Sequence, residues 1–92
     1  MRNQRHFENP RRDAYQIRTV IADLDRTIQL LNCDIGMREE DAGTNDPADL
    51  AYPATARAMA VRRDNLEITV AALERRLADR LLQVENVAVE AK

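Results

Sequence analysis

The chain has few of the residues that build a compact globular core or a β-sheet. Its 92 residues include no Trp, and the aromatic residues are Phe7, Tyr15 and Tyr52. A single compact core of this size usually relies on more large rings than that. Only two Gly and three Pro stand among many Ala, Leu, Arg, Glu and Asp. This composition is typical of long helices rather than of sheets or disordered chains.

Cysteine, histidine and long apolar runs are scarce as well. Cys33 is the only cysteine, so no internal disulfide can form, and we expect a reducing, cytoplasmic compartment. No apolar run approaches the roughly 18 residues that a membrane span needs, and nothing resembles a secretion signal. Because His6 is the only histidine, we expect neither a metal site nor a cofactor. Arg outnumbers Lys thirteen to one, which suggests a GC-rich bacterial genome.

Proline, glycine and asparagine mark the ends of two predicted helices. Asn9 is a candidate N-cap and Pro10 suits the first helical position, while Gly43 is a candidate left-handed C-cap. These signals predict a first helix over about 10–41. Pro53 either closes a short turn after Asp46-Pro47 or opens the second helix.

The remaining segments follow from these boundaries. We predict a connector over about 42–53 and a second helix over about 54–87, which together with the first helix form one helical unit over 10–88. Residues 1–9 are expected to be a flexible, Arg-rich arm, and residues 88–92 a frayed tail.

Apolar residues recur at steps of three and four along both predicted helices, as in a heptad repeat. The seam of the first helix contains Ile17, Ile21, Leu24, Ile28, Leu31 and Ile35. The seam of the second helix contains Met59, Leu66, Val70, Leu73, Leu77, Leu81 and Val84. An antiparallel arrangement that places Ile28 opposite Leu66 also places Ile35 opposite Met59. We therefore predict an all-α, coiled-coil-like hairpin with these residues as its core.

The charges alternate along the chain in a way that suits this hairpin. Residues 19–53 carry two Arg against eight acids, whereas residues 54–80 carry six Arg against four acids. In the predicted register Arg26 lies near Glu67. Arg63 falls opposite Leu31, which its aliphatic stem could cover.

A second apolar stripe lies outside the predicted seam. The candidate oligomer or partner interface consists of Leu30, Cys33, Met37, Val61, Ile68 and Leu82. Two helices that bury one stripe each gain little over the entropy lost on ordering the chain, so a lone hairpin has a poor margin of stability. We therefore expect a homodimer in which two hairpins form a four-helix bundle.

The stretch TVIADLDRTI, residues 19–28, resembles the nucleophile motif of haloacid-dehalogenase-type phosphatases. That resemblance implies that Asp23 attacks phosphorus and that Asp25 handles the leaving-group proton. The phosphatase motif requires a buried parallel strand, but Leu24 and Ile28 belong to a helical seam. Two residues apart on a helix, the carboxylates diverge by about 200°. The chain is also too short for that family's doubly wound sheet, so we expect no enzyme.

Three functional hypotheses remain. The first is a non-enzymatic helical module that self-associates and binds another, unidentified protein. The second is a nucleic-acid-binding helical bundle that uses a candidate electrostatic arm, Arg2, Arg5, Arg11 and Arg12. A pI of about 5.4 disfavours this second hypothesis, because nucleic-acid binders are usually strongly basic. The third is a small assembly or secretion chaperone.

Overall fold

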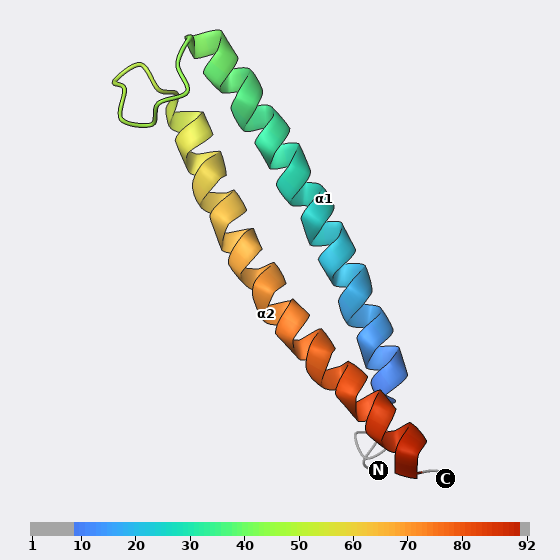
Figure 1. Cartoon of the computed structure of the whole chain (residues 1–92). Coiled ribbons are helices and arrows are strands. Elements are labelled where there is room, and N and C mark those ends of the chain that lie inside the picture. The colour runs from blue at the N-terminus through green and yellow to red at the C-terminus, as the bar shows by residue number, and fades with distance from the viewer. Residues whose placement is uncertain (1–8, 91–92) are drawn as a thin grey trace, which may run out of the picture.

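A computed structural model describes the backbone of residues 9–90 and the side chains of residues 9–86. Over these residues the chain forms two helices, α1 (Pro10–Ala42) and α2 (Ala54–Glu90). They run antiparallel and side by side, with the connector at one end of the molecule (Figure 1). The molecule is elongated, with extents of 63 × 29 × 17 Å. The prediction of an all-α helical hairpin is confirmed.

Side-chain and backbone caps fix the ends of α1. The Asn9 side chain accepts hydrogen bonds from the backbone N–H groups of Arg11 and Arg12, as expected of an N-cap residue. At the other end Gly43 has φ 75°, and backbone N–H groups of the cap reach Glu39 and Glu40 carbonyls. Both cap predictions are confirmed, and α1 ends one residue beyond its predicted end.

The connector is ordered by hydrogen bonds of its own. Asp46 Oδ1 accepts from the Ala48 N–H at 3.0 Å, and Asp49 Oδ1 accepts from the Ala51 N–H at 2.9 Å. Aspartates that bond two residues ahead in this way form tight turns, so the segment does not begin a helix at Asp46. The carbonyl of Pro53 accepts the first helical bond of α2, and Pro53 therefore precedes the second helix directly.

The far end of α2 differs from its prediction. The helix runs to Glu90, so residues 88–90, which were expected in a frayed tail, are helical. Residues 91–92 and residues 1–8 of the predicted arm lie outside the described part of the chain.

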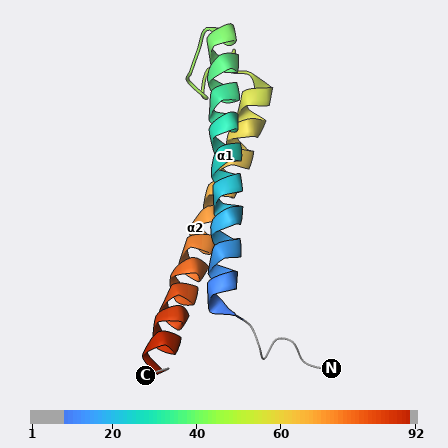
Figure 2. The same cartoon turned by 90° about the vertical axis from the view of Figure 1, so that its right-hand side faces the viewer.

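The seam between the helices is buried most completely on the α1 side and at the connector end. In α1, Ala14, Ile17, Ile28, Leu31 and Ile35 are buried. The residues Ile21, Leu24, Met59, Leu66, Leu73, Leu77 and Val84 are half-buried, and Val70 is buried. The helices cross at a small angle (Figure 2), as expected for two helices packed along a heptad seam.

Polar contacts between the helices show their register. Arg63 bonds to Asn32, which is the neighbour of Leu31, its predicted opposite residue. Arg80 contacts Asp13 and Arg38 contacts Thr55, and each of these pairs also lies one residue from the predicted register. The alignment of the two helices therefore agrees with the expected one to within one residue along these contacts.

Leu81 is not part of the seam. It is 39% exposed, whereas Arg80 turns its side chain inward and keeps only 26% of it exposed. The reason is the heptad itself, because Arg80 follows Leu73 by seven residues and Leu81 follows it by eight. Assigning the seam by apolar identity at this point was wrong, and the spacing of the repeat decides it.

Candidate interaction surfaces

The connector end of the hairpin is closed by an aromatic side chain that the seam prediction missed. Tyr52 is 8% exposed and forms a buried cluster with Ile35 and Ala56, against which Met59 and Ala60 pack. The signal was present in the sequence, since Tyr52 precedes Met59 by seven residues and Ala56 precedes Arg63 by seven. Tyr52 precedes α2, which begins directly after Pro53, so the repeat continues beyond the end of the helix.

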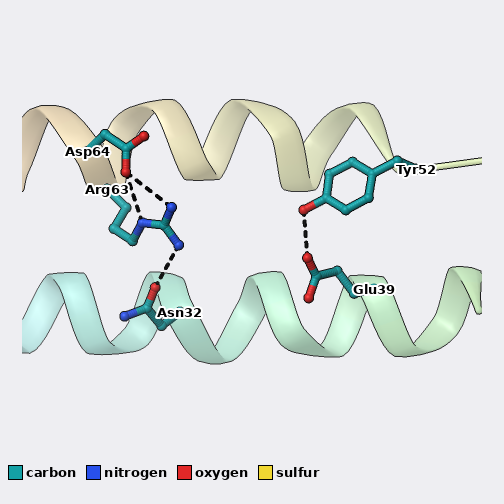
Figure 3. A network of polar contacts seen from close by, with 5 residues as sticks. All are labelled: Asn32, Glu39, Tyr52, Arg63 and Asp64. Atoms are coloured by element: carbon teal, nitrogen blue, oxygen red, sulfur yellow. Dashed lines mark hydrogen bonds and ion pairs between the residues drawn. The ribbon is translucent and has the colours of Figure 1, made fainter. Parts of the chain in front are cut away.

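Polar contacts hold Tyr52 in place (Figure 3). Its hydroxyl donates a hydrogen bond of 2.8 Å to Glu39 Oε2, and the Arg57 guanidinium lies over its ring at 5.3 Å from the centroid. The hydrogen bond to Glu39 raises the pKa of Tyr52, and burial and the negative charge of Glu39 act in the same direction. The neutral phenol is therefore the form that the folded hairpin favours.

Arg63 connects the two helices in the half of the hairpin nearer the connector. Its Nη1 donates to Asn32 Oδ1 at 3.1 Å across the seam, while Nε and Nη2 donate to Asp64 Oδ1 on α2 (Figure 3). The side chain stays 29% exposed. The adjacent Leu31 is buried, as expected if the stem of Arg63 covers it.

Ion pairing at the surface is more local than expected. Arg26 pairs with Asp23, three residues earlier on α1, at 3.1 Å, and not with Glu67 on the other helix. Both side chains are more than half exposed, so a short local contact costs less ordering entropy than a reach across the hairpin. Among the described residues, the ion pair between Arg80 and Asp13 at 3.6 Å is the one that joins the helices.

The open end of the hairpin contains a groove of about 320 Å³. It is lined by Asp13, Gln16, Ile17, Val20, Leu73, Arg76 and Arg80. The groove is partly polar, and the Arg80 in it is already held by Asp13.

The predicted interface residues all lie at the surface. Leu30, Met37, Val61, Ile68 and Leu82 are between 57% and 68% exposed. Cys33 is exposed between the first two of them. Side chains of this size are normally exposed singly, and a repeated series on one helix is typical of a contact surface.

These residues form two separate faces on opposite edges of the hairpin. Leu30 follows the seam residue Ile28 by two positions, and Ile68 follows Leu66 by two. At about 100° per residue, each exposed side chain points roughly 200° away from its seam. We call Leu30, Cys33 and Met37 the α1 outer face, and Val61, Ile68 and Leu82 the α2 outer face.

The phosphatase-like stretch lies wholly within α1. Asp23 and Asp25 are both exposed, and Asp23 is paired with Arg26. The Thr27 hydroxyl donates to the Asp23 carbonyl, a bond between successive turns of one helix. The stretch therefore has none of the strand-and-loop geometry that the phosphatase motif requires.

The candidate electrostatic arm is only partly described. Arg11 and Arg12 are exposed in the first turn of α1, where their backbone N–H groups bind the Asn9 cap. Arg2, Arg5 and His6 lie outside the described residues.

Metal-binding clusters and membrane-spanning helices are both absent from the described part of the chain. Over residues 9–86, no three His, Cys, Asp or Glu side chains are grouped so as to hold a metal ion. Over residues 9–90, neither α1 nor α2 combines the length and the apolar character that crossing a membrane requires.

Comparison with known proteins adds no relative. The sequence matches no protein-family model, no curated protein and no solved structure.

Proposed function

We propose that this chain is a non-enzymatic protein-interaction module: a helical hairpin that self-associates into a dimer of four helices and binds a second protein. The observation that carries the proposal is the pair of outer faces. Each presents large aliphatic side chains that are more than half exposed, on a hairpin whose seam already buries its own apolar stripe.

The energetic balance supports association. A two-helix hairpin buries one stripe per helix, and several seam residues of α2 remain only half-buried. Burying a large aliphatic side chain contributes about 1.5–3 kcal/mol. Covering either outer face would therefore add substantially to the small free energy of unfolding expected for a lone hairpin. The four helices of the dimer would shield one face of each hairpin and leave the other face for a partner.

Because the two faces lie on opposite edges, one can form the dimer while the other binds a partner. A dimer formed through one edge leaves the other edge fully accessible, so self-association and partner binding need not compete. In such a dimer two of the four helices lie at the centre and the other two lie outside them.

Sedimentation equilibrium of the full chain at tens of micromolar tests self-association. We expect a mass of two chains for the wild type, and a shift toward one chain when the large side chains of the outer face that forms the dimer are replaced by Ser (Leu30 with Met37 on α1, or Ile68 on α2). The same replacement on the other outer face should leave the dimer intact. Leu50→Ser is the control, because Leu50 is fully exposed in the connector, away from either outer face. A wild-type chain that stays monomeric throughout this range would contradict the proposal.

A pull-down from an extract of the native host addresses the second protein. A protein that binds the wild type and the Leu50→Ser variant, but does not bind a variant with a substituted outer face, is assigned to that face. If every captured protein binds all variants equally, partner binding through the outer faces is wrong.

A further inference from the structure

Gly36 occupies a position where the hairpin itself has no need of glycine. It lies in the interior of α1, and its backbone does not adopt positive φ. A Cβ atom added there would meet nothing within 4 Å. Glycine in a helix interior is less favourable than alanine, because its backbone loses more freedom on folding. No contact within the single hairpin therefore requires a glycine at this position.

The surroundings of Gly36 are the α1 outer face. Gly36 is three residues from Cys33 and adjacent to Met37, so two small residues lie side by side at the edge of the α1 outer face. The surface at Gly36 is hollow, and this hollow continues along α1 past Glu39 and Glu40 to the connector. Small residues between larger ones allow the backbone of another helix to approach closely.

We infer that residues 26–40 of α1 form a two-fold symmetric dimer interface with the same segment of a second copy, antiparallel and centred on Cys33. In such a pair, residues equally distant from Cys33 along the chain face each other. Leu30 of each copy then faces Gly36 of the other. The inference rests on the proposed self-association and names the surface that carries it.

The charges at the ends of this segment fit the antiparallel direction. Arg26 and Glu40 are each seven residues from Cys33 and are both exposed, so each Arg26 faces the Glu40 of the second copy. The local pair of Arg26 with Asp23 leaves the guanidinium at the surface. A parallel arrangement would instead place Arg26 beside Arg26 and Glu40 beside Glu40. Opposite charges at the rim favour the correct orientation more than they raise affinity.

The α2 outer face contains no glycine. Gly36 and Gly43 are the only glycines of the chain, and Gly43 is needed for the cap of α1. Self-association is therefore assigned to α1, and the α2 outer face stays available to the partner.

Thiol crosslinking of the full chain tests the register directly. A short bis-maleimide added to the wild type should give a covalent dimer on a denaturing gel, because facing helices approach to about 8–10 Å. The matched control carries Cys33→Ser and Thr19→Cys. Thr19 lies on the same edge, but in the antiparallel dimer the two copies of position 19 are separated by roughly 42 Å at 1.5 Å per residue, so no dimer is expected. Equal crosslinking from positions 19 and 33 would overturn the antiparallel interface.

Gly36→Ala supplies a second test with two opposing readouts. The added methyl group should raise the melting temperature of the dilute, monomeric chain through helix propensity. It should also weaken dimerisation by at least about tenfold, because the methyl group would occupy space at the position that Leu30 of the second copy faces. An unchanged dimer dissociation constant in this variant contradicts the inference.

The two proposals fail in different ways. A wild-type dimer in sedimentation that does not crosslink through Cys33 would leave self-association standing and reject this interface. A monomer under all conditions would reject both.

Discussion

Tyr52 shows how much one side chain contributes to the closed end of the hairpin. It is not in a helix, yet its ring fills the space between Ile35 and Ala56, and its hydroxyl is bound to Glu39. The connector therefore does more than join the helices, because it delivers the side chain that seals their seam.

We expect Tyr52→Phe to lower the melting temperature by a few degrees, because it keeps the ring and removes the hydrogen bond to Glu39. The measurement is thermal unfolding followed by circular dichroism. A double-mutant cycle with Glu39→Ala provides the control, since Tyr52→Phe should cost little once the acceptor is absent. Equal losses in both backgrounds would show that the bond contributes nothing.

The raised pKa of Tyr52 adds a pH dependence with a definite sign. Because the folded state holds the phenolic proton more tightly than the unfolded chain, this stability is fully present below about pH 10. It is lost as the pH rises from there through the pKa of the folded state. The free energy of unfolding, measured with denaturant at increasing alkaline pH, should therefore fall more steeply for the wild type than for the Tyr52→Phe variant. Parallel curves for the two proteins would contradict this assignment.

The helices themselves are defined by their ends. α1 begins at a side-chain cap and stops at a left-handed glycine, and no basic residue stands in its last turn. Gly43 therefore determines where α1 ends and in which direction the connector leaves it.

Gly43→Ala should reduce the free energy of unfolding by about 1 kcal/mol, because φ 75° is unfavourable for a residue with a Cβ atom. Urea unfolding at a dilute, monomeric concentration measures this change. Gly36→Ala serves as the matched control on the same helix, with the opposite sign expected. A stabilised Gly43→Ala variant would show that the cap conformation is unimportant.

Heptad spacing predicted the two helices, and the caps of α1 were readable from Asn9, Pro10 and Gly43. The spacing did not identify every seam residue. Tyr52 was missed because it lies before Pro53, outside the helix. Arg80 was missed because a charged side chain was not expected to point toward the seam. A long aliphatic stem allows Arg to take such a position while its guanidinium reaches an acid.

The surface was predictable in outline but not in its pairings. The outer positions of Leu30 and Ile68 follow from helical geometry alone. Arg26, in contrast, pairs with Asp23 and not with Glu67, because flexible exposed side chains form ion pairs with the nearest opposite charge.

The hairpin as a whole is held by one continuous seam, so its register governs every other contact. A slip of one residue would turn the buried side chains of α1 away from those of α2, whereas Arg63 bonded to Asn32 favours the observed alignment.

An engineered disulfide tests this register. In a Cys33→Ser background, Ile28→Cys with Leu66→Cys should form an intramolecular bond faster under mild oxidation than a pair out of register, because a disulfide requires the two Cα atoms to approach to within about 7 Å. The control pairs Ile28→Cys with Leu77→Cys, eleven residues further along α2, or roughly 16 Å at 1.5 Å per residue. Mass spectrometry and a non-reducing gel report the product. Comparable oxidation rates for the two pairs would show that the helices slide.

The start of α1 and the end of α2 lie at the same end of the molecule, opposite the connector (Figure 1). Tension applied between these two ends would load the seam one layer at a time. It would open first at Asp13 and Arg80, and last at the Tyr52 cluster. Force applied between the connector and either end would act along the helices and strain many layers together. The hairpin should therefore unzip at low force in the first direction and resist shear in the second.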